Sequence, residues 1–264
     1  MDIFSYDFMI RAILVGFMLG IIIPLIGVNV VVKRLSMIGD ALSHSSLAGV
    51  TIGLFFGFNP LLGAAIACLV ASFLIEFIRK KSKFFEEMSI SIVLSFSLAI
   101  AGIISGLIKN SSNVSSFLFG SIVMISDMEF YFTIAIFLLV LIFMLIFYKD
   151  LLYLSVDQTS AELSGINTKL INSLFTFLTA LTVSIASRSV GTLMVSSLIV
   201  LPVASSIKLT KSYKGLNLLS VLIGLITIEL GLFMSFYLDL KPGSTIVLLN
   251  CILYIILTIF RRGK

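Results

Sequence analysis

Long apolar segments recur along the whole chain, and they constrain its fold more than any other feature. A helix needs about 20 residues to cross the hydrocarbon core of a bilayer. Segments close to that length, separated by short polar turns, predict about nine membrane-spanning helices. They are residues 8–32, 35–58, 61–78, 87–108, 128–148, 168–186, 190–209, 216–238 and 244–260. Because lipid offers the backbone no hydrogen-bond partner, we expect an all-α polytopic membrane bundle, with residues 1–264 forming one transmembrane domain.

The charged residues agree with this interpretation and indicate an orientation. They make up 12% of the chain, against about 25% in soluble domains. When the predicted spans alternate across the membrane, 14 of the 18 Lys and Arg residues fall on the side of the C-terminus. Short cytoplasmic loops are enriched in basic residues, so we expect the N-terminus outside and the C-terminus inside. The net charge of +5 therefore reflects orientation, and we expect no nucleic-acid partner.

Three features are expected to interrupt the regular helices. Residues 117–125 are apolar but too short to cross a bilayer, which predicts a re-entrant or interfacial helix there. Because proline lacks a backbone N–H, we expect Pro24 to kink the first span and Pro202 to break the seventh.

Two ionisable residues lie within the second predicted span. Asp40 and His44, the only histidine of the chain, are four residues apart, so a helix places them on one face. Ionisable groups are costly inside a bilayer and usually serve a function, and a carboxylate with an imidazole suits manganese, iron or zinc. The alternative is a hydrogen-bonded pair that fixes helix packing. We expect Ser36 and Ser43 to extend this polar face. The glycines that follow at GxxxG spacing would let another helix approach closely: Gly49, Gly53 and Gly57.

Other polar or reactive residues in the spans have simpler interpretations. Glu229 lies within the eighth predicted span and could relay a metal ion, or could hydrogen-bond to a neighbouring hydroxyl. Glu76 lies one turn before Arg79, which indicates an interfacial ion pair. Cys68 and Cys251 lack the spacing of a thiolate metal site, so we expect them to be small buried residues.

The polar interval of residues 149–167 has a helical pattern of its own. Asp157, Ala161 and Gly165 recur every four residues, and the predicted orientation places the interval in the cytoplasm. An amphipathic stretch of this kind is typical of a helix on the membrane surface, and equally of a helix gripped by a cytoplasmic partner.

Five motifs occur in order along the chain: IGDALSHSSLAGV (38–50), FLFGSIVMIS (117–126), DQTSAELSGI (157–166), VGTLMVSSLIVLPVASS (190–206) and FYLDLKPGSTIVL (236–248). Together they resemble the membrane subunits of ABC importers for manganese, zinc and iron. The resemblance covers nearly the whole chain, with Val203 where alanine is usual and Lys241 inserted at a variable position.

The resemblance implies a permease of vitamin-B12-permease-like architecture in the cytoplasmic membrane of a prokaryote. Such a permease would form a homodimer, receive its metal from an extracellular or periplasmic metal-binding protein, and hold no permanent cofactor. Two cytoplasmic ATPase subunits would dock on the interval at Asp157, Ala161 and Gly165. The chain has no GxxxxGK[ST] phosphate loop, so we expect that it cannot hydrolyse ATP. We therefore expect a transport subunit that is not an enzyme and that relies on these partners for ATP hydrolysis.

We expect a metal ion to follow a path between two copies of the chain. It would enter at an outer gate near Arg188, Gly191 and Asp239, although a turn-capping role for Asp239 is the simpler interpretation. Asp40 and His44 from both copies would then hold it transiently. This ligand set, which offers no thiolate, favours manganese or iron over zinc.

Three other functions would require features that differ from those of a metal importer. A permease for a metal chelate such as haem or a siderophore would need a wide path, in which Asp40 and His44 would be superfluous. A secondary transporter or channel would need no docking interval. An intramembrane metalloprotease would need an HExxH motif, which a chain with one histidine cannot contain.

Overall fold

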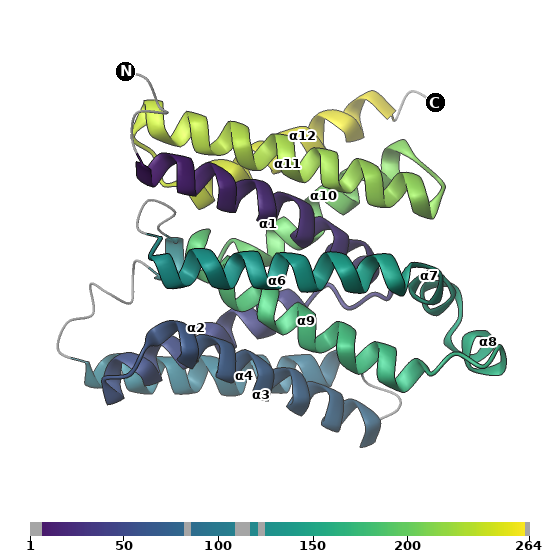
Figure 1. Ribbon diagram of the computed structural model, residues 1–264, viewed down its shortest axis with the longest axis horizontal. Coiled ribbons are helices and arrows are strands. Elements are labelled where there is room, and N and C mark those ends of the chain that lie inside the picture. Colours follow the sequence, from purple (N-terminus) through teal and green to yellow (C-terminus); the bar gives the residue numbers. More distant parts are fainter. Residues whose placement is uncertain (1–6, 82–85, 109–116, 121–124, 262–264) are drawn as a thin grey trace.

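The computed structural model describes residues 7–81, 86–108, 117–120 and 125–261, with the side chains of residues 80, 86 and 261 left undescribed. Over these residues the chain is built from helices and the turns between them (Figure 1). The helices are α1 (Asp7–Val32), α2 (Ile38–Phe56), α3 (Pro60–Lys81), α4 (Glu86–Leu107), α6 (Asp127–Ile146), α7 (Tyr148–Val156), α8 (Gln158–Leu163), α9 (Thr168–Ser189), α10 (Val195–Leu209), α11 (Tyr213–Leu238) and α12 (Pro242–Arg261).

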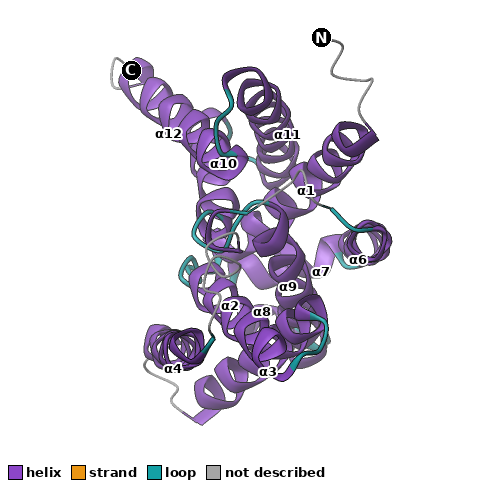
Figure 2. Ribbon diagram, turned by 90° about the vertical axis from the view of Figure 1, so that its left-hand side faces the viewer, coloured by secondary structure: helices purple, strands orange, loops and turns teal. Residues whose placement is uncertain are grey.

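The helices pack in three groups, which Figures 1 and 2 show from perpendicular directions. One group contains α1, α10, α11 and α12, and another contains α2, α3 and α4. Helix α9 lies between the groups, where it contacts α3 and α2, with α6 beside it. Helix α1 is the most buried of the long apolar helices, because neighbours surround an almost uniformly apolar sequence.

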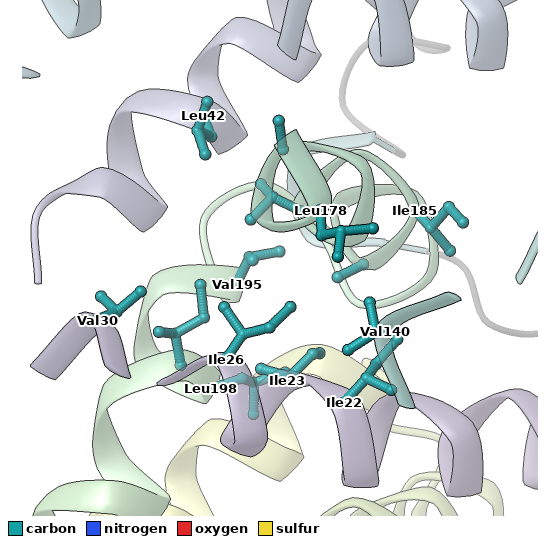
Figure 3. Packing of buried hydrophobic residues seen from close by; sticks show 14 of the residues in the cluster. Ile22, Ile23, Ile26, Val30, Leu42, Val140, Leu178, Ile185, Val195 and Leu198 are labelled. Atoms are coloured by element: carbon teal, nitrogen blue, oxygen red, sulfur yellow. The ribbon is translucent and has the colours of Figure 1, made fainter. Parts of the chain in front are cut away.

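The main apolar core lies where α1, α2, α6, α9 and α10 meet (Figure 3). Branched aliphatic side chains from these helices interdigitate, and because lipid tails are as apolar as these side chains, close van der Waals packing holds the helices together there. The labelled members of this core are Ile22, Ile23, Ile26, Val30, Leu42, Val140, Leu178, Ile185, Val195 and Leu198.

All nine predicted spans are present as helices, but they are not equivalent. Among the described residues, seven helices are long and apolar enough to cross a membrane: α1, α3, α4, α6, α9, α11 and α12. Helix α10 has only 15 residues, because residues 190–194 form a turn that the sequence pattern included in the span. Helix α2 has 19 residues, but with an acid, a histidine and three serines it does not reach the hydropathy of those seven helices.

Proline interrupts the helices less than expected. The prediction that Pro202 breaks its span is wrong, since α10 runs through it from Val195 to Leu209. Close packing holds the helix on both sides of the proline. A Cβ at Gly27 of α1 would lie 2.2 Å from the carbonyl oxygen of Ile199, so the two backbones touch there. Pro24 lies inside α1, which continues to Val32.

The glycines of the predicted GxxxG series in α2 have two different roles: close packing against α3 and termination of the helix. Gly49 and Gly63 cross in backbone contact, since a Cβ at Gly49 would lie 2.1 Å from the carbonyl oxygen of Gly63. Gly53 packs against Pro60 in the same interface, as GxxxG spacing predicts. Gly57 instead ends α2 with φ 74°, a left-handed conformation that glycine adopts without strain.

The structure describes only part of the predicted re-entrant segment, residues 117–125, but all of the polar interval, residues 149–167. Residues 117–119 form a helical turn, while 121–124 lie outside the described residues. The carbonyls of Phe117 and Leu118 accept hydrogen bonds from the N–H groups of Thr192 and Leu193. The interval of residues 149–167 contains α7 and α8, which lie together beyond the ends of α6 and α9 (Figure 1).

Candidate functional site

Asp40 and His44 are the only partly exposed residues over most of α2. Every other residue from Ile38 to Thr51 is buried against neighbouring helices. The four-residue spacing places both side chains on one face, one turn apart. The polar pair therefore forms a narrow strip on a helix that is otherwise packed on all sides.

The imidazole of His44 has a nitrogen without a hydrogen-bond partner among the described residues. This nitrogen, Nδ1, is buried. Within that part of the chain, no hydrogen bond joins the Asp40 carboxylate to the imidazole either. A neutral imidazole nitrogen without a proton is an acceptor, and the same lone pair binds a metal ion. The strip thus presents a carboxylate and an imidazole with a nitrogen free to coordinate.

The serines of α2 do not belong to this strip. Ser43 is fully buried and donates to the carbonyl oxygen of Asp40, so the prediction that it extends the polar face is wrong. Ser45 hydrogen-bonds to Ser97 of α4 at 2.7 Å. Ser46 hydrogen-bonds to Ser187 of α9 at 2.5 Å. The helical angle turns these hydroxyls toward the neighbours, where pairing offsets the cost of burying them.

Contacts with α3 place the strip near the middle of the bundle. The thiol of Cys68 donates to the carbonyl oxygen of Leu42 at 3.2 Å. Cys68 follows Pro60, the first residue of α3, by eight residues, which is about 12 Å along the helix. Asp40 lies two residues further from that end, so it lies at about 15 Å, half of a roughly 30 Å hydrocarbon core. A charged ligand at this depth must be carried by protein groups.

Glu229 occupies a different seam, between α11 and α1. Its Oε1 atom is buried and has no hydrogen-bond partner among the described residues. A Cβ at Gly16 of α1 would lie 3.3 Å from this oxygen, so the carboxylate packs directly on the α1 backbone. Over the described residues, no three His, Cys, Asp or Glu side chains gather into a metal-binding group. One chain therefore does not combine Glu229 with Asp40 and His44 in such a group.

An ion pair that sequence reasoning missed fixes the end of α9 against α6. Arg188 donates through Nε to Oε1 of Glu129 at 2.7 Å, and its guanidinium carbon lies 4.3 Å from the ring centroid of Phe117. Glu129 also closes a capping box with Ser126 at the start of α6. The Ser-x-x-Glu pattern before an apolar run is a readable signal of that box, but the sequence does not reveal its long-range partner.

Backbone contacts join Gly191 to the segment that contains Phe117. Gly191 has φ 105°, and a Cβ there would lie 2.4 Å from the carbonyl carbon of Phe119. Gly243, at the start of α12, approaches the carbonyl oxygen of Val190 equally closely. Asp239 caps the end of α11 in a left-handed conformation, as the turn-capping interpretation predicts. Three chain segments are thus in direct backbone contact at this end of the bundle.

The repeated residues of the interval 149–167 each stabilise α8. Asp157 caps its N-terminus by accepting from the backbone N–H groups of Thr159 and Ser160. The Ser160 hydroxyl donates to the same carboxylate, and this bond is the largest of several that lower the pKa of Asp157. Ala161 is buried against the bundle, and Gly165 turns the chain at φ 85°. The spacing therefore builds a helix and its exit turn.

Comparisons with known proteins cover nearly the whole chain. A family model described as the ABC 3 transport family matches residues 5–261. A "Probable iron transport system membrane protein" of Haemophilus influenzae is 33% identical over 97% of this chain and 91% of its own length. The manganese import system permease protein ScaB of Streptococcus parasanguinis is 30% identical over 96% and 90%, respectively. A solved structure of PsaBC from Streptococcus pneumoniae in complex with Fab is similar at a TM-score of 0.84 and 28% identity, covering 96% of this chain and 91% of that one.

Proposed function

This chain belongs to the ABC 3 transport family as a membrane permease subunit of a metal-ion transporter, and we propose that it imports a divalent transition metal using ATP hydrolysed by partner subunits. Manganese is the favoured cargo. Its support is a relative named for manganese import and a strip of carboxylate and imidazole without thiolate. Iron and zinc are the alternative cargoes, and a relative named for iron transport supports iron.

The exposed strip on α2 carries the proposal. Asp40 and His44 bind the ion transiently, and His44 Nδ1 supplies a lone pair that no described residue occupies. Two copies related by a two-fold axis supply up to four protein ligands, and water completes the shell. This incomplete set suits transport, because an ion held by a full cage would leave slowly. Glu229 is a candidate relay only if movement or the second copy brings it to the path.

The arrangement of helices supports a homodimer. Figure 2 shows α12 and α4 on the same side of the molecule, with α10 and α2 between them. These two outer helices are the least buried of the seven long apolar helices, so they have the most surface left to cover. A second copy on this side would enclose α2 at the dimer axis and leave the opposite side to lipid.

The other subunits of the transporter meet the two ends of the bundle. Leu163 and Val156 flank the α8 region with exposures of 85% and 80%, which suits a docking face for the ATPase. The metal-delivery protein docks at the opposite end, where Arg188, Gly191 and Asp239 form the outer gate region. In this proposal α2 and α10 complete nine spans of a vitamin-B12-permease-like architecture, with the N-terminus outside and the C-terminus inside.

Reconstitution with the partner ATPase tests the proposed reaction. The chain is co-purified with its ATPase and inserted into vesicles, with ATP in the lumen on the ATPase side and the metal-delivery protein outside, and uptake of radioactive manganese is followed. We expect uptake with the active ATPase and none with an ATPase lacking its catalytic glutamate. Uptake driven by an ion gradient without ATP would identify a secondary transporter, and uptake of haem in place of manganese would identify a chelate permease.

A further inference from the structure

A second site lies on the side of the molecule away from α4 and α12. A groove of about 520 Å³ opens between α1, α11 and the start of α7. Ile21, Leu25, Leu218 and Val221 form its apolar walls, and Leu218 is 61% exposed. Its volume falls within the roughly 300–1,000 Å³ of sites that hold small organic ligands.

Polar groups line only one end of this groove. Lys214, Asn217 and Tyr148 lie there, within the first turns of α11 and α7. Lys214 is exposed, and it forms no hydrogen bond or ion pair with any part of the chain that the structure describes. The groove therefore has one cationic end and an apolar remainder, as an amphiphile with an anionic head requires.

Aromatic contacts hold the tyrosine at that end in place. The ring of Tyr148 lies 5.5 Å from the ring of Tyr213, measured between centroids. The Tyr213 hydroxyl donates to Oδ1 of Asn29 on α1 at 3.0 Å, which anchors it to the bundle. Tyrosine and lysine beside an apolar surface are the side chains that membrane proteins place at the level of lipid headgroups.

The position of the groove distinguishes lipid from a second copy of the chain. Helices α1, α6 and α7 lie on the opposite side of the molecule from α4 and α12 (Figure 2). The apolar walls descend from the polar end along α1 and α11, both long enough to span the membrane. A free phosphate would leave these walls uncovered, whereas an acyl chain would cover them.

We propose that this groove binds an anionic glycerophospholipid, with its phosphate at Lys214 and Tyr148 and an acyl chain along the apolar walls. The bound lipid belongs to the leaflet at the basic end of the bundle, where Lys211 precedes α11 and Lys214 lies in its first turn. Each lysine near a membrane surface attracts anionic lipid by about 1 kcal/mol, which corresponds to about fivefold enrichment over the bulk lipid.

Photocrosslinking from within the groove tests this proposal. The full chain, co-purified with its ATPase, is placed in nanodiscs of phosphatidylcholine with a minority of phosphatidylglycerol, carrying benzoylphenylalanine at position 218. The measured quantity is the ratio of the two lipids among crosslinked products. Position 222, which is exposed on the same helix but outside the groove, provides the comparison. We expect about fivefold enrichment of phosphatidylglycerol at 218 and the bulk ratio at 222.

Two charge variants assign the enrichment to the groove. Lys214→Gln should return position 218 to the bulk ratio, whereas Lys211→Gln, just before α11 and outside the groove lining, should leave the enrichment unchanged. Val221→Phe should lower total lipid crosslinking at 218 by filling the wall, which keeps the proposal testable if Lys214→Gln disturbs insertion. The bulk ratio at 218 in the unaltered chain, equal losses in both lysine variants, or crosslinks to protein in place of lipid would overturn the proposal.

Discussion

Conservative replacement of the two ionisable residues of α2 should separate transport from folding. In Asp40→Asn and His44→Gln, the side chains keep nearly the same size and remain polar. No described hydrogen bond involves either side chain, and both are partly exposed. Substitutions without a lost packing or hydrogen-bond partner usually change the free energy of unfolding by no more than about 0.5 kcal/mol. Assembly with the ATPase and thermal stability should therefore be preserved.

Metal uptake, unlike stability, should fall strongly in both variants. In the proposed homodimer, a divalent cation midway through the bundle would depend on the Asp40 carboxylate for compensating charge, and the symmetric copy would lose the same charge. Removing one partner of a desolvated charge pair costs about 2–5 kcal/mol, which corresponds to at least about 30-fold in affinity. We therefore expect manganese uptake by Asp40→Asn to fall at least about 30-fold in proteoliposomes. His44→Gln should lose uptake as well, because an amide offers no imidazole nitrogen.

The matched control lies on the same helical face. Met37 is exposed beside the start of α2, and Met37→Leu conserves volume without altering charge. It should transport manganese as the unaltered chain does. Normal uptake by both Asp40→Asn and His44→Gln, in complexes that assemble fully, would refute the reasoning that the strip binds the ion. Equal losses in Met37→Leu would show that any change on this face disturbs transport.

Further predictions concern the framework around the strip. Gly49→Ala should destabilise the bundle by about 1–3 kcal/mol in thermal unfolding, because its Cβ would meet the Gly63 carbonyl at 2.1 Å. Gly102→Ala, with nothing within 4 Å, should not, and a similar loss in both would contradict the packing argument. Leu163→Ser should weaken co-purification of the ATPase while the melting temperature stays unchanged; undiminished co-purification would exclude α8 as its docking helix. The lowered pKa of Asp157 means that its cap stabilises α8 above the ordinary Asp pKa of about 3.9 and is lost as pH falls through the folded value. The protection factors of the α8 amides, which compare their exchange rates with those of an unstructured chain at the same pH, should fall over that acid range, and unchanged protection factors would disprove the cap.

The candidate site could be located from the sequence, but its surroundings could not. Four-residue spacing within an apolar run was enough to place Asp40 and His44 on one face of a helix. The same periodicity assigned Ser43 to the wrong environment, because it does not reveal where neighbouring helices pack. The Arg188–Glu129 ion pair could not be predicted from the sequence either, since its partners are 59 residues apart and belong to different helices.

By itself, the sequence determined that the chain is a helical membrane protein and where its apolar helices lie. It also determined that Asp40 and His44 are the two ionisable residues in the second of them. These properties are local, because backbone hydrogen bonding in lipid leaves an apolar segment few alternatives to a helix. Only the tertiary structure decided that α2 begins midway through the bundle, that Pro202 leaves α10 continuous, and that Gly49 and Gly63 are in backbone contact. Those outcomes depend on contacts between segments distant in sequence, since close packing selects which faces are covered and which remain open to an ion.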